Sequence, residues 1–93
     1  MIAKIKIQSK KQGEIDRFLS EFFNTNINLE NKTHWEKDYK NPVEISDIIG
    51  AYIDNKEDFD INLWISLDKD IFIKINEDNA DGIIRYLFER YPY

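Results

Sequence analysis

The stretch INLWISLDKDIFIKIN, residues 61–76, decides the fold of this chain. It contains two runs of alternating apolar and polar side chains, separated by the polar residues Asp68, Lys69 and Asp70. A period of two places every second side chain on the same face of a β-strand. The stretch therefore predicts two antiparallel strands joined by a short turn.

The aliphatic side chains of this hairpin predict its register. A three-residue loop at 68–70 keeps all of them on one face, whereas a two-residue loop would split them between the two faces. The predicted pairs are Leu67 with Ile71, Ile65 with Ile73, and Leu63 with Ile75. We expect Ile65 and Ile73 to be core residues. On this register Trp64 lies across from Lys74, with Phe72 diagonal to Trp64, and these three lie on the opposite face.

Two more strands are predicted before the hairpin. Residues 2–8 alternate regularly, with Lys4 and Lys6 on the face opposite the apolar side chains. Residues 33–39 form a shorter strand with two different faces. Trp35 and Tyr39 lie on one of them, and His34, Glu36 and Asp38 on the other.

Three helices are predicted from apolar side chains spaced at i, i+3 and i+4. They cover residues 10–23, 42–53 and 80–91. Polar side chains that can bond to free backbone N–H groups mark the three starts. Ser9 with Gln12 marks the first, Asn41 before Pro42 the second, and Asn79 the third, while Pro92 ends the last helix.

These elements predict a single α+β domain with the order βαβαββα. The sheet is expected to be four-stranded and largely antiparallel, with the three helices mainly on one face. The asparagine-rich segment 24–32 has no periodicity and predicts a connecting loop. A length of 93 residues suits one domain with a single core.

Composition limits the function and the compartment. The formal charge of −5 disfavours nucleic acid as a partner, because the overall field would repel phosphates. No apolar segment is long enough for a membrane span or a signal peptide, and there is no cysteine. We therefore expect a cytoplasmic protein with no membrane partner. Sixteen isoleucines, ten lysines and nine asparagines suggest an AT-rich coding sequence, as in low-GC bacteria.

One strand face carries residues that could perform chemistry. His34, Glu36 and Asp38 place an imidazole and two carboxylates on the same face, which could supply metal ligands or an acid/base pair. Alternate Cα atoms of a strand are about 6.5–7 Å apart, so three such side chains converge poorly on one small ion. A metal-binding protein or enzyme centred on these residues is the alternative interpretation, and a solvated, ion-paired face is favoured over it.

Other chemical motifs are weak. Asp58, Asp60 and Asn62 match the first positions of a calcium loop, but Leu63 stands where the turn needs glycine and Lys69 where a glutamate belongs. There is no glycine-rich phosphate loop and no nucleophile elbow. The sequence therefore predicts no cofactor and no catalytic residue.

The face opposite the predicted core carries the strongest functional signal. Trp64 and Phe72 lie there beside Lys74, and aromatic residues often anchor protein interfaces. We therefore expect a non-catalytic protein-binding or regulatory module that uses these residues. Its partner is expected to be another protein or a second copy of the chain.

Overall fold

The computed structural model describes residues 2–23, 33–68 and 70–91. Along the chain the elements are β1 (Ala3–Gln8), α1 (Glu14–Phe23), β2 (His34–Tyr39), α2 (Pro42–Asn55), β3 (Asn62–Asp68), β4 (Ile71–Lys74) and α3 (Ala80–Arg90). The predicted order βαβαββα is confirmed. The expected loop at 24–32 and the expected helix stop at Pro92 lie outside the described residues.

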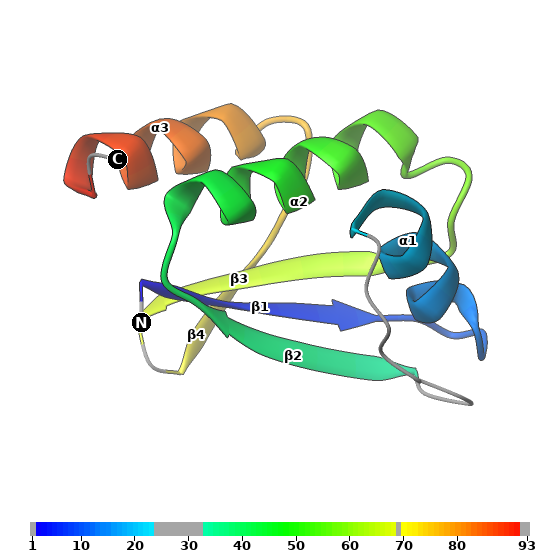
Figure 1. The fold of residues 1–93 in the computed structure, drawn as a ribbon. Helices are drawn as coiled ribbons and strands as arrows, with labels where there is room; N and C mark the ends of the chain where they lie inside the picture. Colours follow the sequence, from blue (N-terminus) through cyan, green and yellow to red (C-terminus); the bar gives the residue numbers. More distant parts are fainter. Residues whose placement is uncertain (1, 24–32, 69, 92–93) are drawn as a thin grey trace.

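The four strands form one antiparallel sheet in the order β2-β1-β3-β4. The three helices lie on one side of this sheet (Figure 1). The predicted α+β architecture is therefore confirmed, and the structure adds the strand order, with β1 and β3 in the centre. The other face of the sheet is not covered by any described helix.

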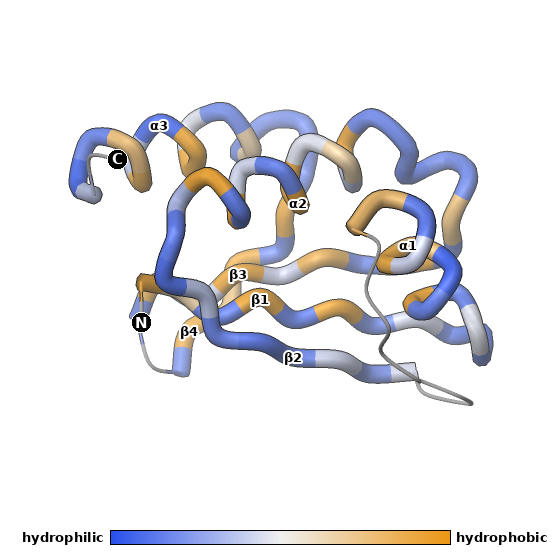
Figure 2. The backbone as a smooth tube through the Cα atoms, in the orientation of Figure 1, coloured by the Kyte–Doolittle hydropathy of each residue, from blue (hydrophilic) through white to orange (hydrophobic). Residues whose placement is uncertain are grey.

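The core begins at the pairing of the two central strands. Ile5 pairs with Ile65 and Ile7 with Leu63, and all four side chains are fully buried under the helices. Along β1 hydrophobic and hydrophilic residues alternate, as Figure 2 shows. The helices add further buried side chains, among them Phe18, Ile45, Ile49 and Leu87.

The hairpin register is confirmed near its open end and wrong near its turn. Trp64 pairs with Lys74 and Ile65 with Ile73, as predicted. Beyond them Ser66 pairs with Phe72 and Asp68 with Ile71, so the predicted pair of Leu67 with Ile71 does not form. A bulge between Ser66 and Asp68 causes the shift, since it leaves Leu67 without an opposite residue. The buried Ser66 hydroxyl donates to the Asp68 carbonyl oxygen within this bulge.

The expectation that Ile73 is a core residue is wrong. Its partner Ile65 is 0% exposed, but Ile73 is 37% exposed and Ile71 is 64% exposed. Both isoleucines belong to β4, which lies at the edge of the sheet. Facing the helix side does not suffice for burial here, because α3 packs on α2 and leaves the edge strand partly open.

The first helix begins later than its apolar spacing predicts. Gly13 adopts a φ of 87°, a left-handed conformation that glycine tolerates best, and α1 starts only at Glu14. The predicted capping box of Ser9 and Gln12 is wrong. Ser9 instead accepts a hydrogen bond from the backbone N–H of Lys11 (3.0 Å) and donates one to the carbonyl oxygen of Asp60.

The caps of the other two helices differ in outcome. The predicted role of Asn41 as the N-cap of α2 is confirmed, since its side-chain oxygen accepts from the backbone N–H of Val43 (2.8 Å). Asn79 makes no side-chain cap for α3. Asn76 and Asn79 instead bond to each other: the Asn76 side chain accepts from the backbone N–H of Asn79 (3.0 Å), and the Asn79 side chain accepts from the N–H of Asn76 (2.9 Å). This reciprocal pair has the pattern of a capping box, but it closes the turn that precedes α3 and not the first turn of the helix itself.

A polar cluster ties α1 to the connection between α2 and β3. Glu14 accepts from the Arg17 guanidinium (2.8 Å) and from the backbone N–H of Asp60 (3.0 Å). Arg17 also donates to the carbonyl oxygen of Asp58 (2.6 Å) and lies over the Phe59 ring at 4.0 Å. The hydrogen bond from Arg17, and then that from Asp60, lower the pKa of Glu14 from 4.5 to about 2.

The rung of Ile65 and Ile73 allows a paired test of burial. Ile65→Ala should lower the free energy of unfolding by about 2–5 kcal/mol, because it leaves a cavity under the helices. Ile73→Ala should lower it by less than about 1 kcal/mol, because the edge side chain already meets solvent. Urea unfolding of both variants measures the difference. Equal losses would mean that the edge of the sheet is covered.

The Glu14 cluster predicts a pH dependence of stability. The folded-state pKa is lowered, so the contribution of the carboxylate is complete above about pH 4.5 and is lost as the pH falls toward 2. Glu14→Gln should therefore be less stable than the native chain at neutral pH, with the difference shrinking across that window. Urea unfolding at several pH values measures it. A difference that does not change with pH would show that the carboxylate charge has no role.

Candidate protein-binding face

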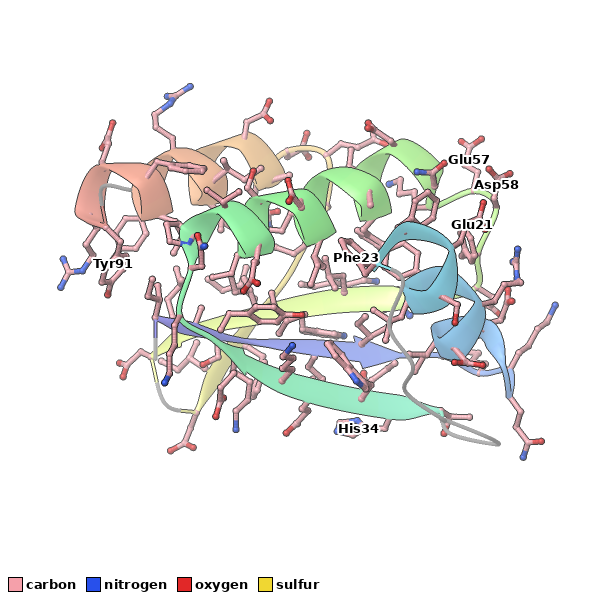
Figure 3. The ribbon with its side chains drawn as sticks, in the orientation of Figure 1. Glu21, Phe23, His34, Glu57, Asp58 and Tyr91 are labelled. Atoms are coloured by element: carbon pink, nitrogen blue, oxygen red, sulfur yellow. The ribbon has the colours of Figure 1, made fainter. Side chains whose placement is uncertain are left out.

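The face of the sheet opposite the helices, the open face, carries the side chains that the sequence predicts as a binding site, Trp64, Phe72 and Lys74. Alternate residues of all four strands project from it: Lys4, Lys6, Gln8, His34, Glu36, Asp38, Asn62, Trp64, Ser66, Phe72 and Lys74. In Figure 3 the His34 side chain points away from the helices, below the sheet. No described helix therefore contributes side chains to the open face.

The strand register arranges these side chains in rungs that cross the sheet. The central rung runs Glu36, Lys6, Trp64, Lys74 in the order β2-β1-β3-β4. The next rung runs Asp38, Lys4, Ser66, Phe72. Negative side chains lie on the edge strand β2, and positive and aromatic side chains lie on the other three strands.

Lys6 lies over both aromatic rings of the open face. Its Nζ is 4.1 Å from the centroid of the Phe72 ring and 5.2 Å from that of the Trp64 ring. Contacts of this kind contribute about 0.5–2 kcal/mol, depending on how well water is excluded. The structure thus brings Trp64 and Phe72 together, with Lys74 across from Trp64. It adds Lys6, which the sequence predicts on this face but not in the site.

The Trp64 ring is half-buried, and its indole N–H is fully shielded. Nε1 has no hydrogen-bond partner among the described residues. A shielded donor without an acceptor costs about 1–3 kcal/mol, which offsets part of what the ring gains by burial. Tryptophan is therefore a poor choice for the stability of the single chain at this position.

The predicted metal or acid/base residues on β2 contact one another and Lys4. His34 Nε2 lies 3.2 Å from Glu36 Oε1. The Lys4 ammonium lies 4.0 Å from Glu36 and 3.9 Å from Asp38. Among residues 2–23, 33–68 and 70–91, no three acidic or histidine side chains come together in a way that could hold a metal ion. The structure thus groups these residues with Lys4 and not around a common centre.

A groove of about 180 Å³ lies on the helix side of β2. Leu19, Trp35 and Tyr39 line it together with the carboxylates Glu44 and Asp47. Burial of its hydroxyl, with the nearby Glu44 charge, raises the pKa of Tyr39 to about 12. Tyr39 therefore keeps its proton near neutral pH, so this phenol is not suited to act as a base.

The comparisons with known proteins leave the question of function to this geometry. The sequence matches no protein-family model, and neither the curated proteins nor the solved structures gave a match. In the described part of the chain, no helix combines the length and the apolar character that crossing a bilayer requires.

The two tryptophans allow a matched test of the shielded indole N–H. Trp64→Phe should leave the free energy of unfolding within about 1 kcal/mol of the native value or raise it, because it removes a donor without an acceptor. Trp35→Phe is the control, and it should be destabilising because it creates a void beside the core. Denaturant unfolding measures both. A loss above about 2 kcal/mol in Trp64→Phe would contradict this expectation.

Proposed function

We propose that this chain is a non-catalytic protein-binding module and that the open face is its binding surface. The observation that carries the proposal is the cluster of Lys6, Trp64 and Phe72 on a sheet face without a covering helix. Large aromatic side chains dominate the energy of protein interfaces, and they do so near the centre of a contact surface. Trp64 occupies a central strand, β3, so it has this position on the open face.

The shape of the open face favours a protein over a small molecule. Small ligands bind in concave sites that bury most of their surface. Neither the groove beside β2 nor a hollow of about 340 Å³ between Leu67 and Tyr91 is lined by Trp64 or Phe72. A broad surface of four strands suits a partner that is itself broad.

The charges of the open face favour binding over catalysis. Lys4 lies beside Glu36 and Asp38, and His34 pairs with Glu36, so these groups satisfy one another. A general base needs a position from which it can reach a substrate proton. The net charge of −5 disfavours nucleic acid, as does the acidic strand β2. We place this function in the cytoplasm, since a chain without cysteine gains nothing from an oxidising compartment.

The alternative function is a metal site at His34, Glu36 and Asp38. Its support is the 3.2 Å contact between His34 and Glu36, which brings two possible ligands together. Adding zinc, manganese or calcium to the purified protein and following the His34 proton resonances tests it. A saturable shift that Asp38→Asn weakens would favour the metal site over the binding module.

Photo-crosslinking from the open face tests the proposed function. A benzoylphenylalanine in place of Phe72 should form an adduct of discrete mass in concentrated purified protein or in extracts of cells that naturally express the chain. The matched control replaces Phe88, a phenylalanine of α3 that is 37% exposed and lies on the helix side. Adducts from position 88 alone, or none from position 72 in either setting, would overturn the proposal.

A further inference from the structure

We propose that the open face binds the open face of a second copy of the chain, related by a two-fold axis that runs parallel to the strands. This inference rests on the proposed function and names the partner. Its basis is the order of charges along the central rung, which reads Glu36, Lys6, Trp64, Lys74 from β2 to β4.

The symmetry operation determines which strands meet. A two-fold axis between two facing sheets and parallel to their strands reverses the strand order and keeps the position along each strand. With the axis midway between β1 and β3, β2 lies over β4 of the second copy, and β1 lies over its β3. Each rung then faces the same rung of the other copy. In a dimer with two-fold symmetry, each contact between two different residues occurs twice.

The central rung is self-complementary under this operation. Glu36 faces Lys74 of the second copy at both ends of the rung, and Lys6 faces Trp64 twice in the middle. The neighbouring rung places Asp38 opposite Phe72 and Lys4 opposite Ser66, so no like charges meet. A two-fold axis perpendicular to the strands would instead place β2 over β2 and β4 over β4. Acidic side chains would then face acidic ones, which is unfavourable.

The side chains at the ends of the rung are accessible for such pairing. Within the described residues Lys74 makes no ion pair, and its position on β4 is exposed. Glu36 is held by Lys4 at 4.0 Å and by His34 at 3.2 Å, and its side chain remains 38% exposed. Surface ion pairs of this kind are weak, so an exchange of partners costs little.

Joining two copies at the edge of the sheet has less support. The edge strand β4 has only four residues, Ile71–Lys74. The side chain of Asn79 donates to the carbonyl oxygen of Lys74 (2.9 Å), so one backbone acceptor of this strand already has a partner. Short and partly blocked edges are common devices against edge pairing.

The size of the open face predicts a weak and reversible dimer. The four strands have between four and seven residues. With a spacing of about 4.8 Å between strands and about 3.4 Å per residue, they cover roughly 400 Å². A stable interface buries about 800 Å² on each partner, so a contact of this size should be weak and should form only at high protein concentration. Facing sheets pack about 10 Å apart with a rotation of about 30°, which preserves the contacts of the central rung best.

A charge exchange between two variants tests the arrangement. Glu36→Lys alone should weaken self-association about tenfold or more, because the introduced lysine then faces Lys74 twice, and Lys74→Glu alone should do the same with two glutamates. A mixture of the two variants should associate more strongly than either variant alone. In the mixed dimer, one contact joins the native Glu36 to the native Lys74, and the other joins the introduced lysine to the introduced glutamate. Sedimentation equilibrium measures the association, and native mass spectrometry with one isotope-labelled variant identifies mixed pairs. Glu89→Lys, with the same charge change on α3, is the control and should not impair association.

The outcomes separate this inference from the proposed function. A native chain that stays monomeric at millimolar concentration, or a mixture that associates no better than the single variants, would overturn the second copy as the partner. If position 72 still crosslinks to a different protein, the open face remains a binding surface for that protein. A monomer without any crosslink from position 72 would overturn both.

Discussion

The antiparallel pairing of β1 with β3 is the contact on which the rest of this structure depends. Ile5 with Ile65 and Ile7 with Leu63 form its buried side, and the three helices pack over them. Because side chains alternate between faces, burying the odd-numbered residues of these strands on one side commits the even-numbered ones to the other. Lys6 and Trp64 therefore reach the open face as a direct consequence of the pairing that forms the core.

Periodicity predicted those features of the fold that depend on residues near one another in the chain. The alternation in residues 2–8 and 61–76 predicted the faces of the strands, and Asn41 predicted the start of α2. The predictions were wrong where the burial or pairing of a residue depends on an element far away in the chain. Ile73 has the pattern of a buried residue, but its exposure follows from the edge position of β4. The bulge at Leu67 is accompanied by a hydrogen bond of Ser66, a residue whose hydroxyl the alternation pattern ignores.

For the candidate site, too, the sequence predicted what depends on neighbouring residues and missed what depends on distant strands. The hairpin alone places Trp64, Phe72 and Lys74 on one face, since their positions follow from local register. The contact of Lys6 with both rings was beyond this reasoning, because it requires β1 to lie next to β3, and strand order does not follow from alternation. The shielded indole N–H was equally hidden, because shielding depends on all the neighbours of the ring.

The contact of Lys6 with the two aromatic rings limits the free energy that a complex can gain from those rings. Lys6 already lies over Trp64 and Phe72, so exchanging one ring for the ring of a partner changes the free energy little, since each contact contributes about 0.5–2 kcal/mol. Selectivity must then come from the ends of the rung, where Glu36 and Lys74 carry opposite charges. On the proposed arrangement such a surface discriminates well between partners but binds them weakly. Weak and selective binding suits a regulatory contact that forms and dissociates with concentration, and it does not suit a permanent assembly.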